Sequence, residues 1–323
     1  MISVENTNEP DSNWNKRLID SKLGTIYQTQ EYGLYTNSTL GWQTDYLKFV
    51  NQKGEIVGQL MLSIYSRFTK KGNVGKILKK ITGQKNKIYR WVYGPIIFDS
   101  IYNDEICKSI RDFLIPKNCR IIGYEHPLSG CTLSSIGNPF QIKQWGTFLI
   151  NLSEKPEILW GKLDKHSARK NIERSQKRGV EIKEMNRSDL ALYQEILSKT
   201  KKKVGSTVYL PELEILWDTL HSIGLTGFLA YKDEIPVGGI IISSFNRYVN
   251  EWGIARSEKD TIEKLYSQDL LKWKIIEWGI DNKFRYYDLT GVNPDSTDEK
   301  EAGIFRYKEK WGGNFIKYTR IVL

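Results

Sequence analysis

Residues 226–244 read TGFLAYKDEIPVGGIIISS, and this stretch decides the fold. Two runs of β-branched, aromatic and small residues flank Lys232-Asp233-Glu234, a polar triplet typical of a hairpin turn. Residues 247–255 predict a third antiparallel strand beside this hairpin. Residues 261–279 then place apolar side chains at helical spacing, and residues 286–289 predict a short strand. The order is therefore antiparallel strands, one helix and one strand.

Helices dominate the stretch before this hairpin. Residues 145–152 predict a strand, after which Ser153 is placed to cap a helix that begins near Pro156. We expect this long helix to run to about Lys177 and to be stopped by Gly179. The remaining elements expected before the hairpin are a strand at 180–184 and helices at 189–200 and 211–224.

The first half of the chain is a looser version of the same order. A hairpin turn is expected at Asn51–Gly54, and a helix at 103–114. The strands expected around them are 42–50, 56–65, 89–98 and 120–124.

The order of strand, helices, antiparallel strands, helix and strand is that of a GNAT-like acyltransferase fold. We therefore predict an α+β protein with two tandem GNAT-like lobes, each a mixed, mostly antiparallel sheet flanked by helices. The predicted lobes are residues 1–150 and 151–323, and the final strand, 314–323, fits either lobe.

The composition excludes several classes of protein. A chain of 323 residues with 40% hydrophobic and 12% aromatic residues can build packed interiors. It has no run of about 18 apolar residues, as a membrane span needs, and its N-terminus has no signal-peptide pattern. Three dispersed cysteines and three isolated histidines argue against disulfides and a zinc site. We expect a cytoplasmic protein without metal or cofactor; peripheral membrane contact and oligomeric state stay open.

Positive charge is concentrated in two blocks of this chain, whose net charge is +10. Residues 67–90 contain nine Lys and Arg and no acidic residue, and residues 74–81 within them predict a short helix. Residues 160–203 contain thirteen Lys and Arg against six Asp and Glu. Both blocks suit a polyanion such as a phosphodiester backbone. The alternative is that they only keep the protein soluble.

The C-terminal region contains the motif most informative about function. It runs Gly303-Ile304-Phe305-Arg306-Tyr307-Lys308-Glu309-Lys310-Trp311-Gly312-Gly313, and it follows Tyr286-Tyr287-Asp288-Leu289-Thr290-Gly291. The motif places a lysine among aromatic rings, beside two glycines that allow a close backbone approach to a ligand. The alternative is a glycine-capped helix end whose aromatic residues at i and i+4 pack into the core.

This motif resembles the closing motif of the Fem-type (FemABX) peptidyltransferases, which move an amino acid from aminoacyl-tRNA onto the peptide of a cell-wall precursor. The resemblance covers most of the chain. Its other segments, in the same order as in that family, are Ile26–Tyr32, Tyr93–Ile97, Leu149–Ser153, His166–Val180 and Asp288–Gly291. The resemblance implies two GNAT-like lobes, aminoacyl-tRNA as the donor, and a peptide-bearing wall precursor or another amine as the acceptor.

Aminoacyl transfer is the attack of an amine on an ester that is already activated. The enzyme has to orient two substrates and stabilise the oxyanion and the leaving alkoxide, so it needs no dedicated nucleophile. We assign electrostatic stabilisation to Lys308 and the orientation or deprotonation of the amine to Asp288. The predicted substrate-binding residues are Arg306, Tyr307, Trp311 and Glu251. The predicted tRNA-binding residues lie on the helix that begins at Pro156: Lys170, Arg174 and Lys177 or Arg178 share one face, and Arg169 belongs to a neighbouring stripe.

Two other functions stay open. The first is N-acyl transfer from a different activated donor to a small amine. An acetyl-CoA donor is disfavoured, since residues 255–262 lack the glycines of a pyrophosphate-binding loop. The second is RNA binding without catalysis, by the two basic blocks alone. The sequence identifies neither the amino acid that is transferred nor the acceptor that receives it.

Overall fold

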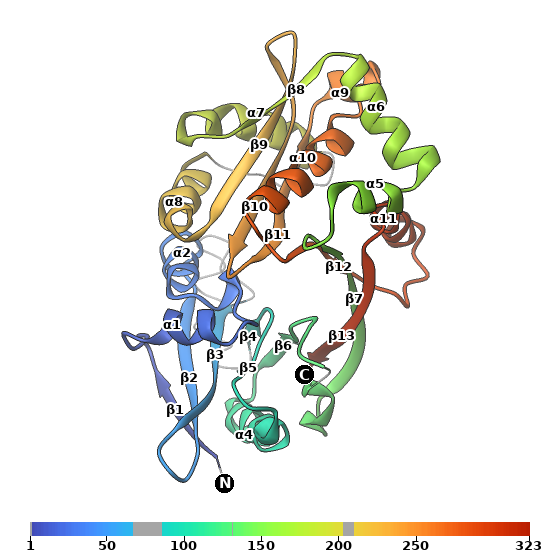
Figure 1. Ribbon diagram of the computed structural model, residues 1–323. Coiled ribbons are helices and arrows are strands. Elements are labelled where there is room, and N and C mark those ends of the chain that lie inside the picture. Colours follow the sequence, from blue (N-terminus) through green and yellow to red (C-terminus); the bar gives the residue numbers. More distant parts are fainter. Residues whose placement is uncertain (1, 67–85, 131, 203–209) are drawn as a thin grey trace. The chain divides into compact units, whose positions relative to one another are not determined.

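The computed structural model describes residues 2–66, 86–130, 132–202 and 210–323 (Figure 1). The chain divides into two compact units, Met1–Gly146 with Ile316–Leu323, and Thr147–Phe315. The sequence-based boundary at residue 150 stays a prediction. The helix expected at 74–81, with most of the basic block around it, lies outside the described residues.

The first unit is built on a mixed sheet. Its strands are antiparallel to their neighbours except for β4 and β6, which are parallel and are joined through helix α4 (Asn103–Leu114). The strands, in spatial order, are β1 (Ser3–Thr7), β2 (Gln43–Val50), β3 (Ile56–Ser66), β4 (Lys87–Trp91), β6 (Arg120–Tyr124) and β13 (Asn314–Val322), and β5 (Ile96–Ile97) pairs with β3. The other helices are α1 (Trp14–Asp20), η1 (Ile26–Gln28), α2 (Gln30–Leu40), η3 (Ser100–Tyr102), η4 (Ile115–Lys117) and η5 (Thr132–Ile136).

The hairpin predicted between β2 and β3 is confirmed. Asn51 Oδ1 accepts hydrogen bonds from the backbone N–H groups of Lys53 and Glu55, at 2.9 and 3.0 Å. Gly54 takes the left-handed conformation that the turn requires, with φ 80°. One face of the sheet then packs on α4, whose buried Ile106, Ile110 and Leu114 join the core of this unit.

The second unit repeats this plan, with four antiparallel strands followed by a parallel pair. Its strands, in spatial order, are β7 (Gln141–Asn151), β12 (Tyr286–Val292), β11 (Tyr248–Arg256), β10 (Ile235–Phe245), β9 (Leu225–Lys232) and β8 (Val180–Glu184). Strands β8 to β11 pair antiparallel, whereas β11 and β12 are parallel. The predicted β9–β10 hairpin is confirmed, and its turn residues Asp233 and Glu234 both have positive φ.

One helix that the sequence predicts as continuous is broken. Instead of one helix from Pro156 to Lys177, the chain forms α5 (Pro156–Lys162), a π-helical turn η6 (Lys165–Arg169) and α6 (Lys170–Lys177). Leu163 is extended, and the Asp164 carboxylate accepts hydrogen bonds from His166 N and Ser167 N and so starts a new helix. The other helices of this unit are η7 (Arg187–Asp189), α7 (Leu190–Lys202), α8 (Leu210–Leu220), η8 (His221–Ile223), α9 (Glu258–Ile262), α10 (Ser267–Asp281) and α11 (Glu299–Glu309).

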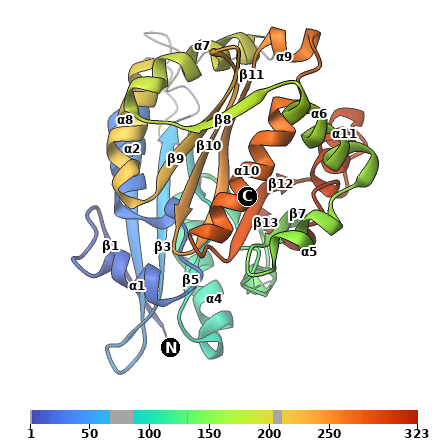
Figure 2. The same cartoon turned by 45° about the horizontal axis from the view of Figure 1, so that its top comes forward.

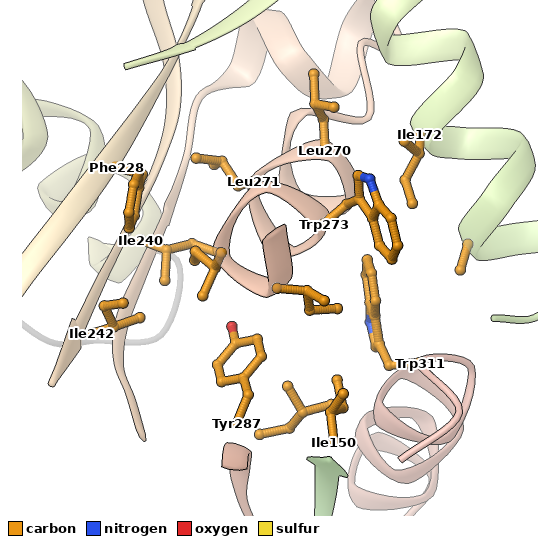
Figure 3. Close-up of a cluster of buried hydrophobic side chains, with 14 of the residues drawn as sticks. Ile150, Ile172, Phe228, Ile240, Ile242, Leu270, Leu271, Trp273, Tyr287 and Trp311 are labelled. Atoms are coloured by element: carbon orange, nitrogen blue, oxygen red, sulfur yellow. The ribbon is translucent and has the colours of Figure 1, made fainter. Parts of the chain in front are cut away.

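Helix α10 lies against the centre of the second sheet. It packs on the face that carries Phe228, Ile240 and Ile242 (Figure 3), while Tyr193 of α7 covers Gly239 on the opposite face. Figure 2 shows α6 beside α10. Because α10 lies between the sheet, α6 and α11, its polar residues Gln268, Asp269 and Lys272 are buried with the apolar ones.

Both units therefore have antiparallel strands, a crossover helix and a parallel strand, and the predicted α+β fold of two GNAT-like lobes is confirmed. Across the described ranges, the structure contains no helix both long and apolar enough to span a bilayer. No cluster of three or more His, Cys, Asp and Glu side chains in that part of the chain is placed to bind a metal ion.

Candidate active site

Lys308 lies in the last turn of α11 and is buried, with 9% of its surface exposed. Its Nζ donates hydrogen bonds to the main-chain carbonyls of Thr290, at 3.0 Å, and Gly291, at 3.2 Å, near the end of β12. Burial lowers the pKa of this lysine to about 8, although the nearby Asp288 carboxylate acts in the opposite direction. A lysine with this pKa exchanges a proton readily near neutral pH.

Asp288 holds together the strands next to Lys308. Its Oδ1 accepts from Thr147 Oγ1 and Thr290 N, and its Oδ2 accepts from Tyr248 Oη and Asn250 Nδ2. The donors come from β7, β11 and β12, and the carboxylate is fully buried. Asp288 thus fixes the backbone whose carbonyls bind Lys308. This geometry favours a positioning role, and its assignment as a base stays a prediction.

Two further buried ion pairs lie on α10. Lys272 pairs with Glu251 of β11, which also accepts from Tyr287 Oη at 2.6 Å. Asp269 pairs with Lys310, which immediately follows α11. Burial and the neighbouring Lys308 and Lys310 charges lower the pKa of Lys272, and burial raises the pKa of Asp269.

Tyr307 connects these ion pairs to a cavity. Its ring lies 4.4 Å from Lys310 Nζ and 5.7 Å from Lys272 Nζ, so two cations contact one aromatic ring. The cavity has a volume of about 390 Å³, which is within the range of small-molecule sites. It is lined by Asn171, Ile254, Arg256, Asp260, Tyr266, Gln268, Asp269 and Tyr307.

The N-terminus of α10 borders this cavity and already binds an anion, the side-chain carboxylate of Asp260. The buried Asp260 carboxylate accepts from the backbone N–H of Ser267, the first residue of α10, at 2.8 Å. Its other oxygen accepts from Arg256 Nε. An exposed helix N-terminus with an arginine is a ready site for phosphate. Here Asp260, from the middle of α9, occupies that place.

The predicted basic row lies beside the cavity. The guanidinium groups of Arg174 and Arg178 lie 5.7 and 5.3 Å from the centre of the Tyr266 ring, and Tyr266 lines the cavity. Arg178 also donates to the carbonyl of Lys264. Lys170, Arg174, Lys177 and Arg178 are exposed, whereas Arg169 at the end of η6 is half-buried.

Comparison with known proteins supports the same fold. No family model matches the sequence, and no curated protein matches it. Among solved structures, FemX has a TM-score of 0.73 and 13% identity, over 98% of this chain and 96% of FemX. The chain shares the fold of FemX.

Two other solved structures are similar at lower TM-scores. L-PGS from Bacillus licheniformis has a TM-score of 0.56 and 12% identity, over 98% of this chain and 92% of that one. A tandem GNAT protein from the clavulanic acid biosynthesis pathway has a TM-score of 0.54 and 11% identity, over 100% and 97%. The predicted Fem-like resemblance is confirmed at the level of fold.

The structure brings some of the predicted site residues together. Lys308, Asp288, Glu251 and Tyr307 belong to one connected region of the second unit, through Thr290 and Lys272. Trp311 is buried in the core near Trp273, as Figure 3 shows, and Arg306 is exposed on α11. The substrate-binding roles of Glu251, Tyr307, Trp311 and Arg306 stay predictions.

The sequence-based prediction missed the polar residues at the start of α10. Gln268, Asp269 and Lys272 interrupt an otherwise apolar helix face, and Asp260 precedes them on α9. Polar residues within a buried helix face are the signal that points to such a site, because burial without a partner is unfavourable.

Proposed function

We propose that this protein is an acyltransferase that moves the aminoacyl group of an aminoacyl-tRNA to the amine of a peptide, such as a peptide-bearing wall precursor. The observation that carries the proposal is the cavity at the start of α10, where Asp260 takes the phosphate position and where Arg174 and Arg178 stand over the ring of Tyr266, a residue of the cavity wall. A cytoplasmic location accords with this donor and belongs to the proposal.

The anion held at α10 argues for this donor against acyl-CoA. A CoA donor brings a pyrophosphate that would need the Ser267 N–H and the Arg256 guanidinium, and Asp260 already binds both. A second anion placed there would meet the buried carboxylate and be repelled. The ester end of an aminoacyl-tRNA carries no pyrophosphate. Its phosphodiester backbone instead suits the exposed cations of α6.

The proposed reaction joins the acceptor nitrogen to the ester carbonyl carbon and breaks the bond from that carbon to the ribose oxygen. The acceptor amine loses one proton, and the ribose oxygen gains one as it leaves as a hydroxyl. In the tetrahedral intermediate the carbonyl oxygen is negative, and we assign its stabilisation to Lys308. A pKa of about 8 also suits Lys308 to pass the proton from the amine to the leaving oxygen.

The test is transfer of labelled amino acids from a mixed pool of charged tRNAs to peptide amines. We expect transfer that ribonuclease abolishes, and no thiol release from acetyl-CoA. Lys308→Met is expected to lower kcat by about 100-fold or more. Lys300→Met, which removes an exposed lysine of the same helix, serves as the matched control. Ribonuclease-resistant transfer would refute the donor, and full activity of Lys308→Met would refute the role of that lysine.

A further inference from the structure

A second cavity, in the first unit, runs along one end of β2. Its volume is about 550 Å³, and four consecutive residues of that strand line it: Gln43, Thr44, Asp45 and Tyr46. Consecutive side chains of a strand point to opposite faces of the sheet, so a wall made of all four follows the edge of the strand. The rest of the wall comes from residues 8–10, where the chain leaves β1, and from α2.

The edge of β2 at this cavity has no strand beside it. Strand β1 pairs with β2 only as far as Thr7, which lies opposite Tyr46. The main-chain carbonyl of Tyr46 accepts from Thr7 Oγ1 at 3.5 Å, so Tyr46 presents its backbone groups to the side of β1. Every second residue of a strand does the same, and Thr44 therefore faces that side just beyond the end of β1. Within the described ranges, its N–H and C=O groups have no backbone partner there.

Tyr46 contributes a buried hydroxyl to the same wall. Only 4% of the residue's surface is exposed, and its hydroxyl makes no hydrogen bond to the described part of the chain. Its Oη lies against α2 at Gly33, where a Cβ atom would stand only 2.3 Å away. The hydroxyl is not among the unpartnered polar atoms that the protein seals off from solvent. A ligand in the cavity can therefore donate to it or accept from it.

The charges at this cavity favour a ligand with a positive charge. Its wall contains two carboxylate residues, Glu9 and Asp45, and no Lys, Arg or His. Neither carboxylate has an ion-pair partner among the residues that the structure describes, and Asp45 accepts from the Asn6 amide at 3.3 Å. Burial raises the pKa of Tyr46, and the nearby Glu31 carboxylate raises it further. The field in the cavity is therefore negative, and a cation that enters it is attracted.

We propose that this cavity binds an extended, lysine-bearing peptide segment, which pairs with β2 at Thr44 in the place where β1 has ended. A peptide added to a free sheet edge gains main-chain hydrogen bonds, and the surrounding side chains select its sequence. Here the carboxylates of the wall select the lysine ammonium, and the Tyr46 hydroxyl binds a polar group of the peptide. The inference goes beyond the proposed function, because no residue of the candidate active site lines this cavity.

The test measures peptide binding by titration calorimetry, with no donor present. The probes are acetylated and amidated alanine pentapeptides whose central residue is lysine, norleucine or glutamate. We expect the lysine peptide to bind about 3- to 10-fold more tightly than the norleucine peptide, and the glutamate peptide to bind most weakly. Gln43→Lys puts a positive charge in the wall and is expected to weaken the lysine peptide by about 5-fold or more. Gln52→Lys, the same change at an exposed residue of the β2–β3 turn, is expected to bind as wild type.

N-methylated versions of the lysine peptide test the strand pairing, because a methylated amide cannot donate a hydrogen bond. The backbone groups of alternate residues face opposite sides of a strand. Methylation of either the odd or the even residues is therefore expected to abolish binding, while the other set changes the affinity by less than about 3-fold. An equal loss from both sets overturns the inference.

Three further outcomes would also overturn it. The first is binding of no lysine peptide at millimolar concentration, and the second is equal binding of the lysine and norleucine peptides. The third is a wild-type dimer, detected by sedimentation, that Gln43→Lys dissociates and Gln52→Lys does not. A second copy of this chain would then occupy the free edge of β2. None of these results bears on the proposed transfer reaction, which has its own assay.

Discussion

Replacing Lys308 by methionine tests whether burial lowers the pKa of this lysine. The folded protein lowers the pKa of Lys308 from its usual 10.5 to about 8. Below pH 8 the lysine is protonated in both states, and above pH 10.5 it is neutral in both. Between these limits the unfolded chain binds one proton more, so stability rises with pH by about 1.4 kcal/mol per pH unit. Over the whole window the gain is about 3 kcal/mol.

The assay is urea unfolding at several pH values from 7 to 10.5, followed by tryptophan fluorescence. The wild-type free energy of unfolding, minus that of Lys308→Met, is expected to grow by about 3 kcal/mol across this range. Methionine loses the bonds to the two carbonyls, which shifts the difference by a constant and leaves its slope unchanged. Lys300→Met is the exposed control on the same helix. A flat difference for Lys308→Met would show that Lys308 titrates as an exposed lysine, and would refute the burial argument.

The remaining predictions concern the groups around that lysine. Asp288→Asn turns one carboxylate oxygen into an N–H₂ group that faces two of the four donors, and should lower the free energy of unfolding by about 2–4 kcal/mol, measured by urea titration; a loss below 0.5 kcal/mol would contradict the four-donor geometry. Arg174→Gln with Arg178→Gln should weaken tRNA binding at low salt and reduce the log–log salt slope by about 2, whereas Lys300→Gln should not. Asp260→Ala frees a helix N-terminus and a guanidinium, so calorimetry should detect pyrophosphate binding that the wild type lacks. If this variant binds no more pyrophosphate than the wild type, Asp260 does not occupy an anion site.

Local sequence chemistry was sufficient to predict the hairpins and the order of the elements. The turns at 51–54 and 232–234 form because their residues supply side-chain hydrogen bonds or left-handed conformations on the spot. The helix expected to continue to Lys177 breaks at Leu163 because the Asp164 carboxylate caps a new helix. Its apolar periodicity continues across the break, so spacing alone did not reveal it.

The site was less predictable because its contacts join distant parts of the chain. Glu251 pairs with Lys272, and Asp288 binds Thr147, so neither partner follows from local spacing. Lys308 was found through its motif, but the carbonyls that bind it depend on how β12 ends. The burial of Gln268 could not be predicted for a different reason. A glutamine in a helix is ordinarily exposed, and only the structure shows that its side-chain oxygen is buried.

The carboxylate at the start of α10 has one more consequence. Because Asp260 belongs to the same short segment as Arg256 and Ser267, it competes for that position at the effective concentration of a tethered group, on the order of millimolar or higher. Free phosphate, nucleotides and coenzyme A would have to displace it from solution against this advantage. Changes in the concentrations of these metabolites should therefore have little effect on the occupancy of this position.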